Sequence, residues 1–315
     1  MKAAVVSAFD TAPRYADVEE PVAAREHEMV VDVLAAGLHP RVRAQADGSH
    51  YTSTGELPLV PGIDGVGRGP DGVLRYFVLP DTTRGAMAER TVVDVRRSIV
   101  LEADADPLAV AAAMNPAMSS WVALRRRVGF RPGCGVLVLG ATGSAGRAAV
   151  VVARLFGAGR VVAAGRDAAR LAALPALGAT DTVVLDGDPG RLGRAAADVD
   201  VVLDYVWGAP TAAAMAAVVT HRADRGQPLT WVEIGSVAGP DAAVPSAALR
   251  AARLQIVGSG QGSVSTADIV AELPALAREI TAGALDAEVA AVPLAEVARA
   301  WAEAPATTRR IVLTP

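Results

Sequence analysis

The chain has 315 residues, enough for two domains of ordinary size, and its formal net charge of −4 gives no overall attraction to nucleic acid or to an anionic membrane. Apolar residues make up 52% of the chain, but no uncharged run free of glycine and proline reaches the roughly 20 residues of a membrane helix. One cysteine, Cys134, excludes an intrachain disulfide and a Cys-x-x-Cys metal site, and the N-terminal apolar stretch is too short for a signal peptide, so we expect a soluble, cytoplasmic protein.

The first hundred residues have the pattern of a β domain. Runs rich in β-branched residues, separated by glycine and proline, predict strands at 2–7, 29–34, 65–67, 73–79 and 89–94. We expect an antiparallel, barrel-like domain with few helices. From Pro107 to Arg127 the composition becomes helical, and Asn115-Pro116 predicts an interruption of that helix.

Between residues 135 and 258 apolar strands alternate with alanine-rich helices. This rhythm predicts a parallel, doubly wound sheet, whose ligands bind beyond the carboxyl ends of the strands. Glycine closes most of the strands, which permits a flat cofactor to approach the backbone. The predicted strands are 136–139, 160–164, 181–185, 200–204, 229–234 and 254–258, and the clearest helices are 145–156, 168–177 and 210–220.

Three glycines follow the first of these strands at positions 140, 143 and 146. Small residues at this spacing let the backbone pass from strand to helix and leave amide groups at the helix start free to bind an anion, most often a pyrophosphate. The spacing departs from the strict G-x-G-x-x-G fingerprint, so a tight connection without a ligand is the alternative. The residues expected to form the phosphate-binding turn are Gly140, Thr142, Gly143, Ser144 and Ala145.

The second strand ends in Gly165-Arg166, about 20 residues beyond the glycine turn. In dinucleotide-binding folds an acidic residue there holds the ribose 2′-hydroxyl, whereas an arginine suits the 2′-phosphate of NADP. We therefore predict NADPH rather than NADH as the cofactor. The alternative is that Arg166 is an ordinary solvated arginine at a strand end.

The last part of the chain returns to shorter elements. The pattern predicts a helix over 266–282, a strand at 289–293, a helix over 294–303 and a final strand at 310–314. These strands cannot extend the nucleotide-binding sheet without long crossovers, so we expect them to rejoin the first domain. The predicted division is 1–114 with 261–315 as the β-rich domain and 115–260 as the nucleotide-binding domain.

Six segments, in this order and spacing, resemble the zinc-free quinone oxidoreductase branch of the medium-chain dehydrogenase/reductase superfamily, over nearly the whole chain. The resemblance implies an α/β protein with a GroES-like catalytic domain, a Rossmann domain, NADPH in a cleft between them, and a homodimer formed through the Rossmann sheets. The segments are Ala35-Ala-Gly-Leu-His-Pro40, Pro58-Leu-Val-Pro-Gly-Ile-Asp-Gly-Val-Gly67, Gly85-Ala-Met-Ala-Glu89, Ser119-Ser-Trp-Val-Ala-Leu124, Pro132-Gly-Cys-Gly-Val-Leu-Val-Leu-Gly140 and Arg310-Ile-Val-Leu-Thr-Pro315.

The resemblance also bears on metal binding. Zinc-dependent members of the superfamily have two cysteines and a histidine where this chain has His39, Asn115 and Ile63, and an isoleucine cannot ligate a metal. We therefore expect no metal site.

The activity that the resemblance implies is hydride transfer from C4 of NADPH to a small-molecule acceptor, either a quinone or an α,β-unsaturated carbonyl, followed by a proton. A trans-acting enoyl or tailoring reductase of a biosynthetic pathway is one alternative. A non-catalytic NADPH-binding sensor or scaffold protein is another. None of these functions involves nucleic acid or insertion into a membrane.

The resemblance assigns further cofactor contacts. Ser119 matches the family's threonine near the nicotinamide, and Val206 lies where the fourth strand meets the dinucleotide. The residues expected near the nicotinamide ribose and carboxamide are Gly235, Ser236, Gly258, Ser259 and Gly260.

Three residues are candidates for the chemistry itself. Tyr51 occupies the family's aromatic position in the substrate pocket, and His39 stands where the branch commonly has asparagine, so either is a candidate proton donor. Asn115 can orient a carbonyl through its amide. Each also has a structural interpretation: a lid residue for Tyr51, a satisfied core histidine for His39, and a helix cap for Asn115.

Overall fold

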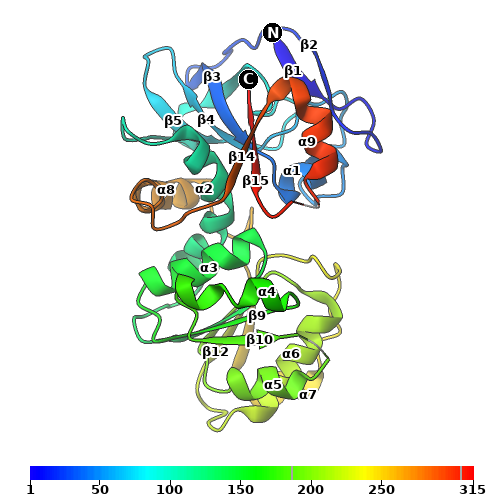
Figure 1. Ribbon diagram of the computed structural model, residues 1–315. Helices are drawn as coiled ribbons and strands as arrows, with labels where there is room; N and C mark the ends of the chain where they lie inside the picture. Colours follow the sequence, from blue (N-terminus) through cyan, green and yellow to red (C-terminus); the bar gives the residue numbers. More distant parts are fainter. Residues whose placement is uncertain (186, 306) are drawn as a thin grey trace. The chain divides into compact units, whose positions relative to one another are not determined.

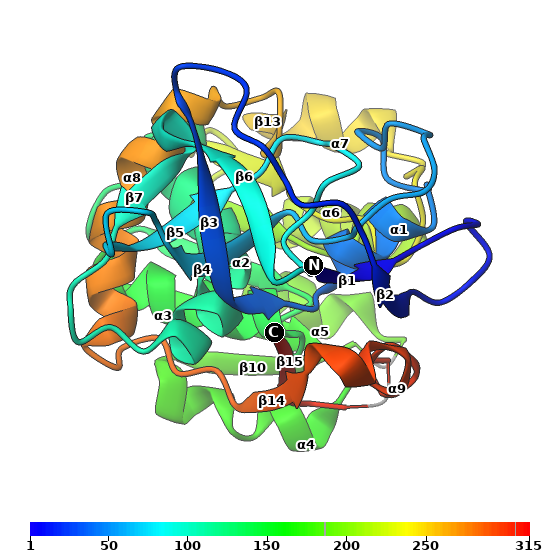
Figure 2. The same ribbon diagram turned by 90° about the horizontal axis from the view of Figure 1, so that it is seen from above.

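The computed structural model describes residues 1–185, 187–305 and 307–315 (Figure 1). The chain forms two compact units. Unit 1 comprises Met1–Asn115 and Val270–Pro315, and unit 2 comprises Pro116–Ile269. Both chain ends therefore belong to unit 1 (Figure 2).

Unit 1 is built on a mostly antiparallel sheet in the order β14-β15-β3-β4-β5-β7, with β6 also paired to β3 and with a separate β1-β2 hairpin. The strands expected in the first hundred residues are confirmed as β1, β3, β4, β5 and β6, whereas β2, β7 and the short helix α1 (Pro40–Ala46) are additional to the prediction. The bounds are β1 Lys2–Val5, β2 Arg14–Asp17, β3 Glu28–Gly37, β4 Asp64–Arg68, β5 Leu74–Val78, β6 Arg90–Asp94, β7 Ser98–Val100, β14 Val289–Pro293 and β15 Arg310–Thr314.

The C-terminal strand closes this sheet. β15 pairs antiparallel with β3, where Leu313 lies opposite Ala36, and parallel with β14. Ile311 and Leu313 are buried in the same core as Val31 and Val33 of β3. Burial of their side chains fixes the register, because a shift by one residue would turn these side chains to the other face. Helix α9 (Val297–Glu303) adds the buried Trp301 to this core.

The helix predicted to break at Asn115-Pro116 does not break there. α2 (Pro107–Val122) runs through Pro116 and continues as a π-helical turn over Ala123–Arg127. A proline in a helix interior costs about 3 kcal/mol, but this helix is apolar on nearly all sides and buries Val110, Met114 and Leu124. Its packing outweighs the lost hydrogen bond. Asn115 therefore lies inside a helix and is not a helix cap.

Unit 2 is a six-stranded parallel sheet in the order β10-β9-β8-β11-β12-β13. In sequence this is 3-2-1-4-5-6, the order of a Rossmann fold, and it reverses between β8 and β11. All six predicted strands are confirmed. Uninterrupted apolar runs such as that of β8 form strands here because they are buried on both faces of the sheet. The bounds are β8 Gly135–Leu139, β9 Arg160–Gly165, β10 Asp181–Val184, β11 Val201–Asp204, β12 Leu229–Glu233 and β13 Leu254–Gly258.

Helices cover both faces of this sheet (Figure 1). α3 and α4 lie on one face, and α5, α6 and α7 lie on the other, where Leu192, Met215 and Val218 pack with Trp231 of β12. The short helices α5 and α7 are additional to the prediction. The bounds are α3 Ser144–Leu155, α4 Ala168–Leu171, α5 Pro189–Ala195, α6 Gly208–His221, α7 Ser246–Ala251 and, between the two units in the chain, α8 Thr266–Thr281.

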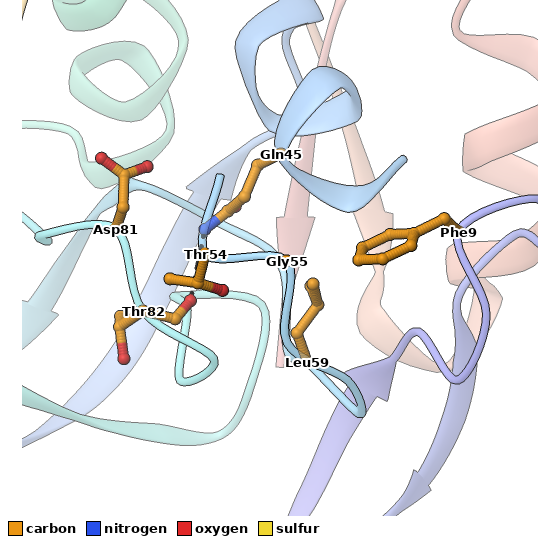
Figure 3. Close-up of a pocket in the computed structure, with 7 residues that line it drawn as sticks. All are labelled: Phe9, Gln45, Thr54, Gly55, Leu59, Asp81 and Thr82. Carbon is orange, nitrogen blue, oxygen red and sulfur yellow. Dashed lines mark hydrogen bonds between the residues drawn. The ribbon is translucent and has the colours of Figure 1, made fainter. Parts of the chain in front are cut away.

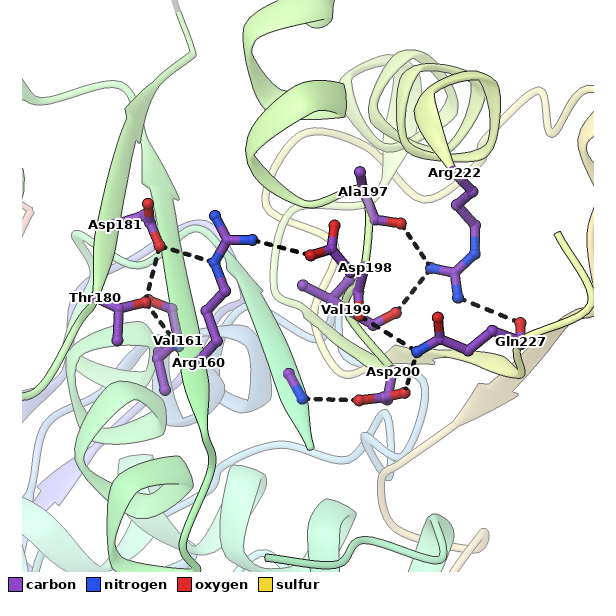
Figure 4. A network of polar contacts seen from close by, with 11 residues as sticks. Arg160, Val161, Thr180, Asp181, Ala197, Asp198, Val199, Asp200, Arg222 and Gln227 are labelled. Atoms are coloured by element: carbon purple, nitrogen blue, oxygen red, sulfur yellow. Dashed lines mark hydrogen bonds and ion pairs between the residues drawn. The ribbon is translucent and has the colours of Figure 1, made fainter. Parts of the chain in front are cut away.

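A polar network holds together the edge of the sheet at which the strands begin (Figure 4). Asp200 accepts hydrogen bonds from the Gly135 amide (2.8 Å) and from Nε2 of Gln227 (2.7 Å), and so connects the starts of β8, β11 and β12. The buried guanidinium of Arg222 donates to the carbonyl of Val199 (2.8 Å). The edge where the strands begin is thus engaged in polar contacts within the protein. The edge where the strands end is the one available to ligands.

No helix in the described ranges is both long enough and apolar enough to cross a bilayer.

Candidate functional site

The turn after β8 exposes the start of α3. Gly140 has φ +85, and the amides of Gly140 and Ala141 both donate to the carbonyl of Ala164 at 2.9 Å. The first bond of α3 runs from the Arg147 amide to the carbonyl of Gly143 (2.9 Å). The amides of residues 144–146 therefore have no acceptor within the helix, and the helix dipole gives them a partial positive charge. This is the arrangement that binds a phosphate group.

Steric contacts explain two of the three glycines. A Cβ on Gly146 would lie 2.2 Å from the Gly140 carbonyl oxygen and 2.6 Å from Cα of Ala141, so only glycine allows α3 to pack this closely on the turn. Gly140 needs its positive φ. At Gly143, by contrast, φ is −80 and a Cβ would make an ordinary 3.6 Å contact, so glycine there only leaves the helix start uncovered.

The end of β9 lies against the same turn. A Cβ on Gly165 would lie 2.7 Å from Cγ2 of Thr142, which means that the threonine side chain packs on the glycine backbone. Arg166 follows with an exposed side chain, and it forms no ion pair with any residue in the described ranges. Asp167 is engaged elsewhere, since its carboxylate caps α4 by accepting from the Arg170 amide (3.0 Å). The free charge at this strand end is therefore positive.

The loop after β11 is organised by Asp204, whose side chain is fully buried. One carboxylate oxygen accepts from the amides of Val206 (2.8 Å) and Trp207 (3.1 Å). The other accepts from Oγ1 of Thr211 (2.6 Å) and Nε1 of Trp231 (2.8 Å). These bonds hold Trp207 at φ +52, a conformation that an isolated tryptophan avoids.

Tyr205 joins this loop to α2. Its hydroxyl lies 3.0 Å from Oγ of Ser119, which itself donates to the carbonyl of Pro116 (2.8 Å). Burial raises the pKa of Tyr205 to about 12, so the phenol stays protonated. A Cβ on Gly140 would contact Val206 at 3.1 Å and Tyr205 at 3.3 Å. The structure thus brings Ser119, Val206 and the glycine turn together at the point where the strand order reverses.

The remaining predicted cofactor residues lie at the ends of β12 and β13. The Gly235 amide donates to the carbonyl of Asp204 (3.1 Å), which places it beside the β11 loop, and Ser236 is exposed. The Ser259 amide donates to the carbonyl of Glu233 (2.8 Å). Burial, and secondarily the charge of Asp204, raises the pKa of Glu233.

At the end of β13, backbone groups are already hydrogen-bonded to side chains of the protein. The carbonyl of Gly258 accepts from Nε of Arg127 (2.7 Å), and the Gly260 amide donates to Oγ of Ser263 (2.8 Å). About 14 Å separates β13 from β8 across the sheet, at the usual spacing between strands. These residues lie at the far end of the row of strand termini.

In unit 1 the predicted catalytic residues lie in different environments. His39 is 3% exposed, and its Nε2 lies 3.0 Å from Oδ1 of the buried Asp64. Tyr51 is 73% exposed, and its ring stacks on that of His50 at 4.3 Å between centroids. Asn115 is half-buried.

Two of the residues at the zinc positions of the resemblance are buried. Ile63 is a buried apolar side chain, and His39 is engaged by Asp64. Within residues 1–185, 187–305 and 307–315, no three histidine, cysteine, aspartate or glutamate side chains are grouped as a metal site would need.

A small depression in unit 1 is lined by none of the predicted residues (Figure 3). Its enclosed volume is about 0 Å³, far below the roughly 300–1,000 Å³ of a ligand pocket. One of its walls is Gln45, whose side-chain oxygen accepts from the Gly62 amide (3.0 Å), so the glutamine is engaged structurally. Its other lining residues are Phe9, Thr54, Gly55, Leu59, Asp81 and Thr82.

Sequence reasoning missed Asp204 and Tyr205 in unit 2, and Asp64 and Tyr76 in unit 1. Asp204 had a recognisable signal, because an acid that ends an apolar strand must find donors when it is buried. Asp64 begins β4 and gave no such signal. The two tyrosines had none, since their partners are distant in the sequence.

Comparison with known proteins agrees with this geometry. No protein-family model matches the chain. A protein of Emericella nidulans described as a probable NADPH-dependent quinone reductase, tdiC, is 32% identical over the full length of both chains. The quinone oxidoreductase of Thermus thermophilus, solved also as a complex with NADPH, is 28% identical with a TM-score of 0.83 over the full length of both chains. A probable oxidoreductase of Mycobacterium abscessus is 26% identical with a TM-score of 0.80, over 100% of this chain and 99% of that one. The chain therefore belongs to the medium-chain dehydrogenase/reductase superfamily, among its quinone oxidoreductase-like members.

Proposed function

We propose that this protein is an NADPH-dependent, zinc-independent oxidoreductase that transfers a hydride to a quinone or to an α,β-unsaturated carbonyl compound. The observation that carries the proposal is the cradle after β8, where Gly146 leaves no room for a Cβ and the amides of residues 144–146 have no helical acceptor. The names of the relatives in Emericella nidulans and Thermus thermophilus support the acceptor class.

The residues fit the cofactor along its whole length. The free amides of α3 bind the diphosphate, and Arg166 pairs with the adenosine 2′-phosphate. Ser119, Val206 and Gly235, gathered around the β11 loop, hold the nicotinamide half, with Ser236 and residues 258–260 beyond them. NADPH supplies the hydride from C4 of its nicotinamide, and the protein supplies position and a dry environment.

The choice of reaction follows from the residue types in unit 1. Oxidation of an alcohol requires an alkoxide, which a Lewis-acidic metal stabilises at neutral pH. Ile63 stands at one of the family's metal positions and offers no ligand atom. Reduction of an electrophilic acceptor needs only the hydride and one proton, so it is the reaction that this set of residues supports.

The outermost strand of the unit 2 sheet supports a homodimer. Among the strands that the structure describes, β13 pairs with β12 alone, and its Leu254, Ile256 and Val257 are half-buried in the single chain. Pairing of two β13 edges would cover these side chains. Sedimentation equilibrium tests the dimer, and a monomer at micromolar concentration would contradict it.

The test of function is the loss of NADPH absorbance with phenanthrenequinone, a simple enone and an enoyl thioester as acceptors. Turnover of the quinone or the enone, unchanged by EDTA, is the expected result. Turnover of the thioester alone would identify a biosynthetic reductase instead. Tight NADPH binding without turnover of any acceptor would identify a sensor or scaffold protein.

A further inference from the structure

Three buried side chains of unit 1 form a continuous hydrogen-bonded chain. His39 follows β3, Asp64 begins β4 and Tyr76 lies in β5. Nε2 of His39 lies 3.0 Å from Oδ1 of Asp64, and the Tyr76 hydroxyl donates to Oδ2 at 2.6 Å. None of the three is more than 3% exposed.

The chemistry of the chain fixes the tautomer of the histidine. An ionised carboxylate only accepts hydrogen bonds. Burial, together with the nearby charge of Asp64, raises the pKa of Tyr76 well above its usual value, so the phenol keeps its proton and donates it to Oδ2. Oδ1 must then accept from Nε2–H of His39. The second ring nitrogen, Nδ1, takes no part in this contact.

Nδ1 of His39 is buried and has no hydrogen-bond partner among the described residues. Leaving a buried polar atom without a partner costs about 1–3 kcal/mol, so such atoms call for an explanation beyond packing. The same cluster includes Arg310 of β15, which donates to the Leu38 carbonyl (3.4 Å) and whose Nε is likewise buried without a partner. Burial lowers the pKa of Arg310, and the nearby charge of Asp64 acts in the opposite direction.

We propose that Nδ1 of His39 donates the proton that completes the reduction, and that Asp64 and Tyr76 are positioning residues that hold the ring in this tautomer. This inference rests on the proposed function. Addition of a hydride to the acceptor leaves an anion on oxygen, or an enolate. The Nδ1–H bond breaks, and an O–H or C–H bond forms on that anion. His39 is left neutral, and its Nε2–H still donates a hydrogen bond to Asp64. One proton from water restores it, so one hydride and one proton are consumed for each turnover.

The environments of the other candidates favour His39. Tyr51 is 73% exposed, so water can protonate the product as readily as its phenol can. Tyr205 is buried, and its pKa of about 12 makes it a weak acid. An imidazole fixed by a carboxylate at one nitrogen is a common general acid in enzymes, and the other nitrogen of His39 is buried without a partner among the described residues.

The test compares His39→Asn with His27→Asn, a change at an exposed histidine of the turn before β3. We expect His39→Asn to lower kcat for quinone reduction by about 100-fold or more, while the Kd for NADPH stays within about twofold. The solvent deuterium isotope effect on kcat should change with it, because the proton source has changed. Asp64→Asn and Tyr76→Phe should lower kcat by about 10-fold with KM unchanged, and His27→Asn should change neither constant.

A second readout needs no cofactor or turnover. The chain has four histidines, so ¹⁵N resonances of the free protein can be assigned by comparison with the His39→Asn variant. We expect Nε2 of His39 to carry a proton in the wild type, and this preference to weaken in Asp64→Asn. A neutral His39 ring with its proton on Nδ1 and none on Nε2 would overturn the proposal.

The outcomes separate this proposal from the function on which it rests. Wild-type turnover together with a His39→Asn rate and isotope effect equal to wild type would overturn the role of His39 alone. Absence of wild-type turnover with every acceptor would overturn the proposed function and this proposal with it.

Discussion

Asp204 is the residue on which the loop after β11 depends. Its two carboxylate oxygens accept four hydrogen bonds, from two backbone amides and from the side chains of Thr211 and Trp231. An acid in this position can be recognised in the sequence as a charge at the end of an apolar strand. Its donors cannot, because Trp231 lies 27 residues away and is brought close only by the pairing of β11 with β12.

Replacement of Asp204 by asparagine should destabilise the protein. The new amide group can accept at one position only, so two of the four donors lose their acceptor, at a cost of about 2–4 kcal/mol. Urea unfolding measures this loss. Asp198→Asn is the matched control, because its side chain is 72% exposed and its ion pair with Arg160 should contribute less than about 0.5 kcal/mol. Equal stability of the two variants would contradict the role given to Asp204.

A substitution at Arg166 tests the preference for NADPH over NADH. Arg166→Asp should weaken NADPH binding by roughly 10–100-fold, because a charge-assisted contact to the 2′-phosphate is replaced by repulsion. NADH should be little affected, since an acidic residue there can accept from the free ribose hydroxyls. Calorimetry with both nucleotides gives the comparison, with Arg250→Asp on the exposed face of α7 as the control. An equal loss for both nucleotides would remove Arg166 from the site.

At the scale of elements, the strands and the glycine turn were predictable because their causes are local. The apolar run of β8 and the glycines at 140 and 146 act through neighbours in the sequence. The sequence predicts an interruption of the helical segment 107–127 because a proline is a local signal, whereas the burial that keeps α2 intact comes from distant parts of the chain. α1 and α7 are too short for a periodic pattern to show.

A substitution at Gly146 tests whether the start of α3 binds the phosphate groups of NADPH. Gly146→Ala would place a methyl group 2.2 Å from the Gly140 carbonyl oxygen. The helix must then move away from the turn, which should cost about 1–3 kcal/mol and raise the Kd for NADPH by about 10-fold or more. Gly129→Ala is the control, because a Cβ there meets nothing within 4 Å. A Gly146→Ala variant that binds NADPH as wild type does would show that the amides of α3 are not the phosphate site.

The segment after α1 should respond to pH through His50. Burial, and then the charge of Arg41, lowers the pKa of His50 from 6.5 to about 4 in the folded protein. Above pH 6.5 both folded and unfolded states are neutral at this residue. As the pH falls from 6.5 toward about 4, only the unfolded state gains the proton, so the free energy of unfolding decreases.

Because the ring is partly exposed, this decrease should be no more than about 1–2 kcal/mol. Urea unfolding on either side of pH 6.5 measures it, and His50→Gln should remove it while His27→Gln should not. An undiminished decrease in His50→Gln would assign the effect to another group.

At the scale of the whole molecule, the chain begins and ends in the same unit. Val312 of β15 pairs with Gly37 of β3. The sequence predicts a return of the C-terminal strands to the first domain because they cannot extend the other sheet without long crossovers. The site is harder to predict than the fold at this scale, because His39, Asp64 and Tyr76 come from three separate elements and each is ordinary in its own sequence context. Only the sheet of unit 1 makes them a hydrogen-bonded chain.

Calorimetric titration of the purified wild-type protein with NADPH and with NADH tests the phosphate cradle directly. We predict one site per chain, micromolar or tighter binding of NADPH, and NADH binding that is at least about 10-fold weaker. Absence of heat from both nucleotides, or equal affinity for the two, would contradict a phosphate cradle at the start of α3 with Arg166 at its side.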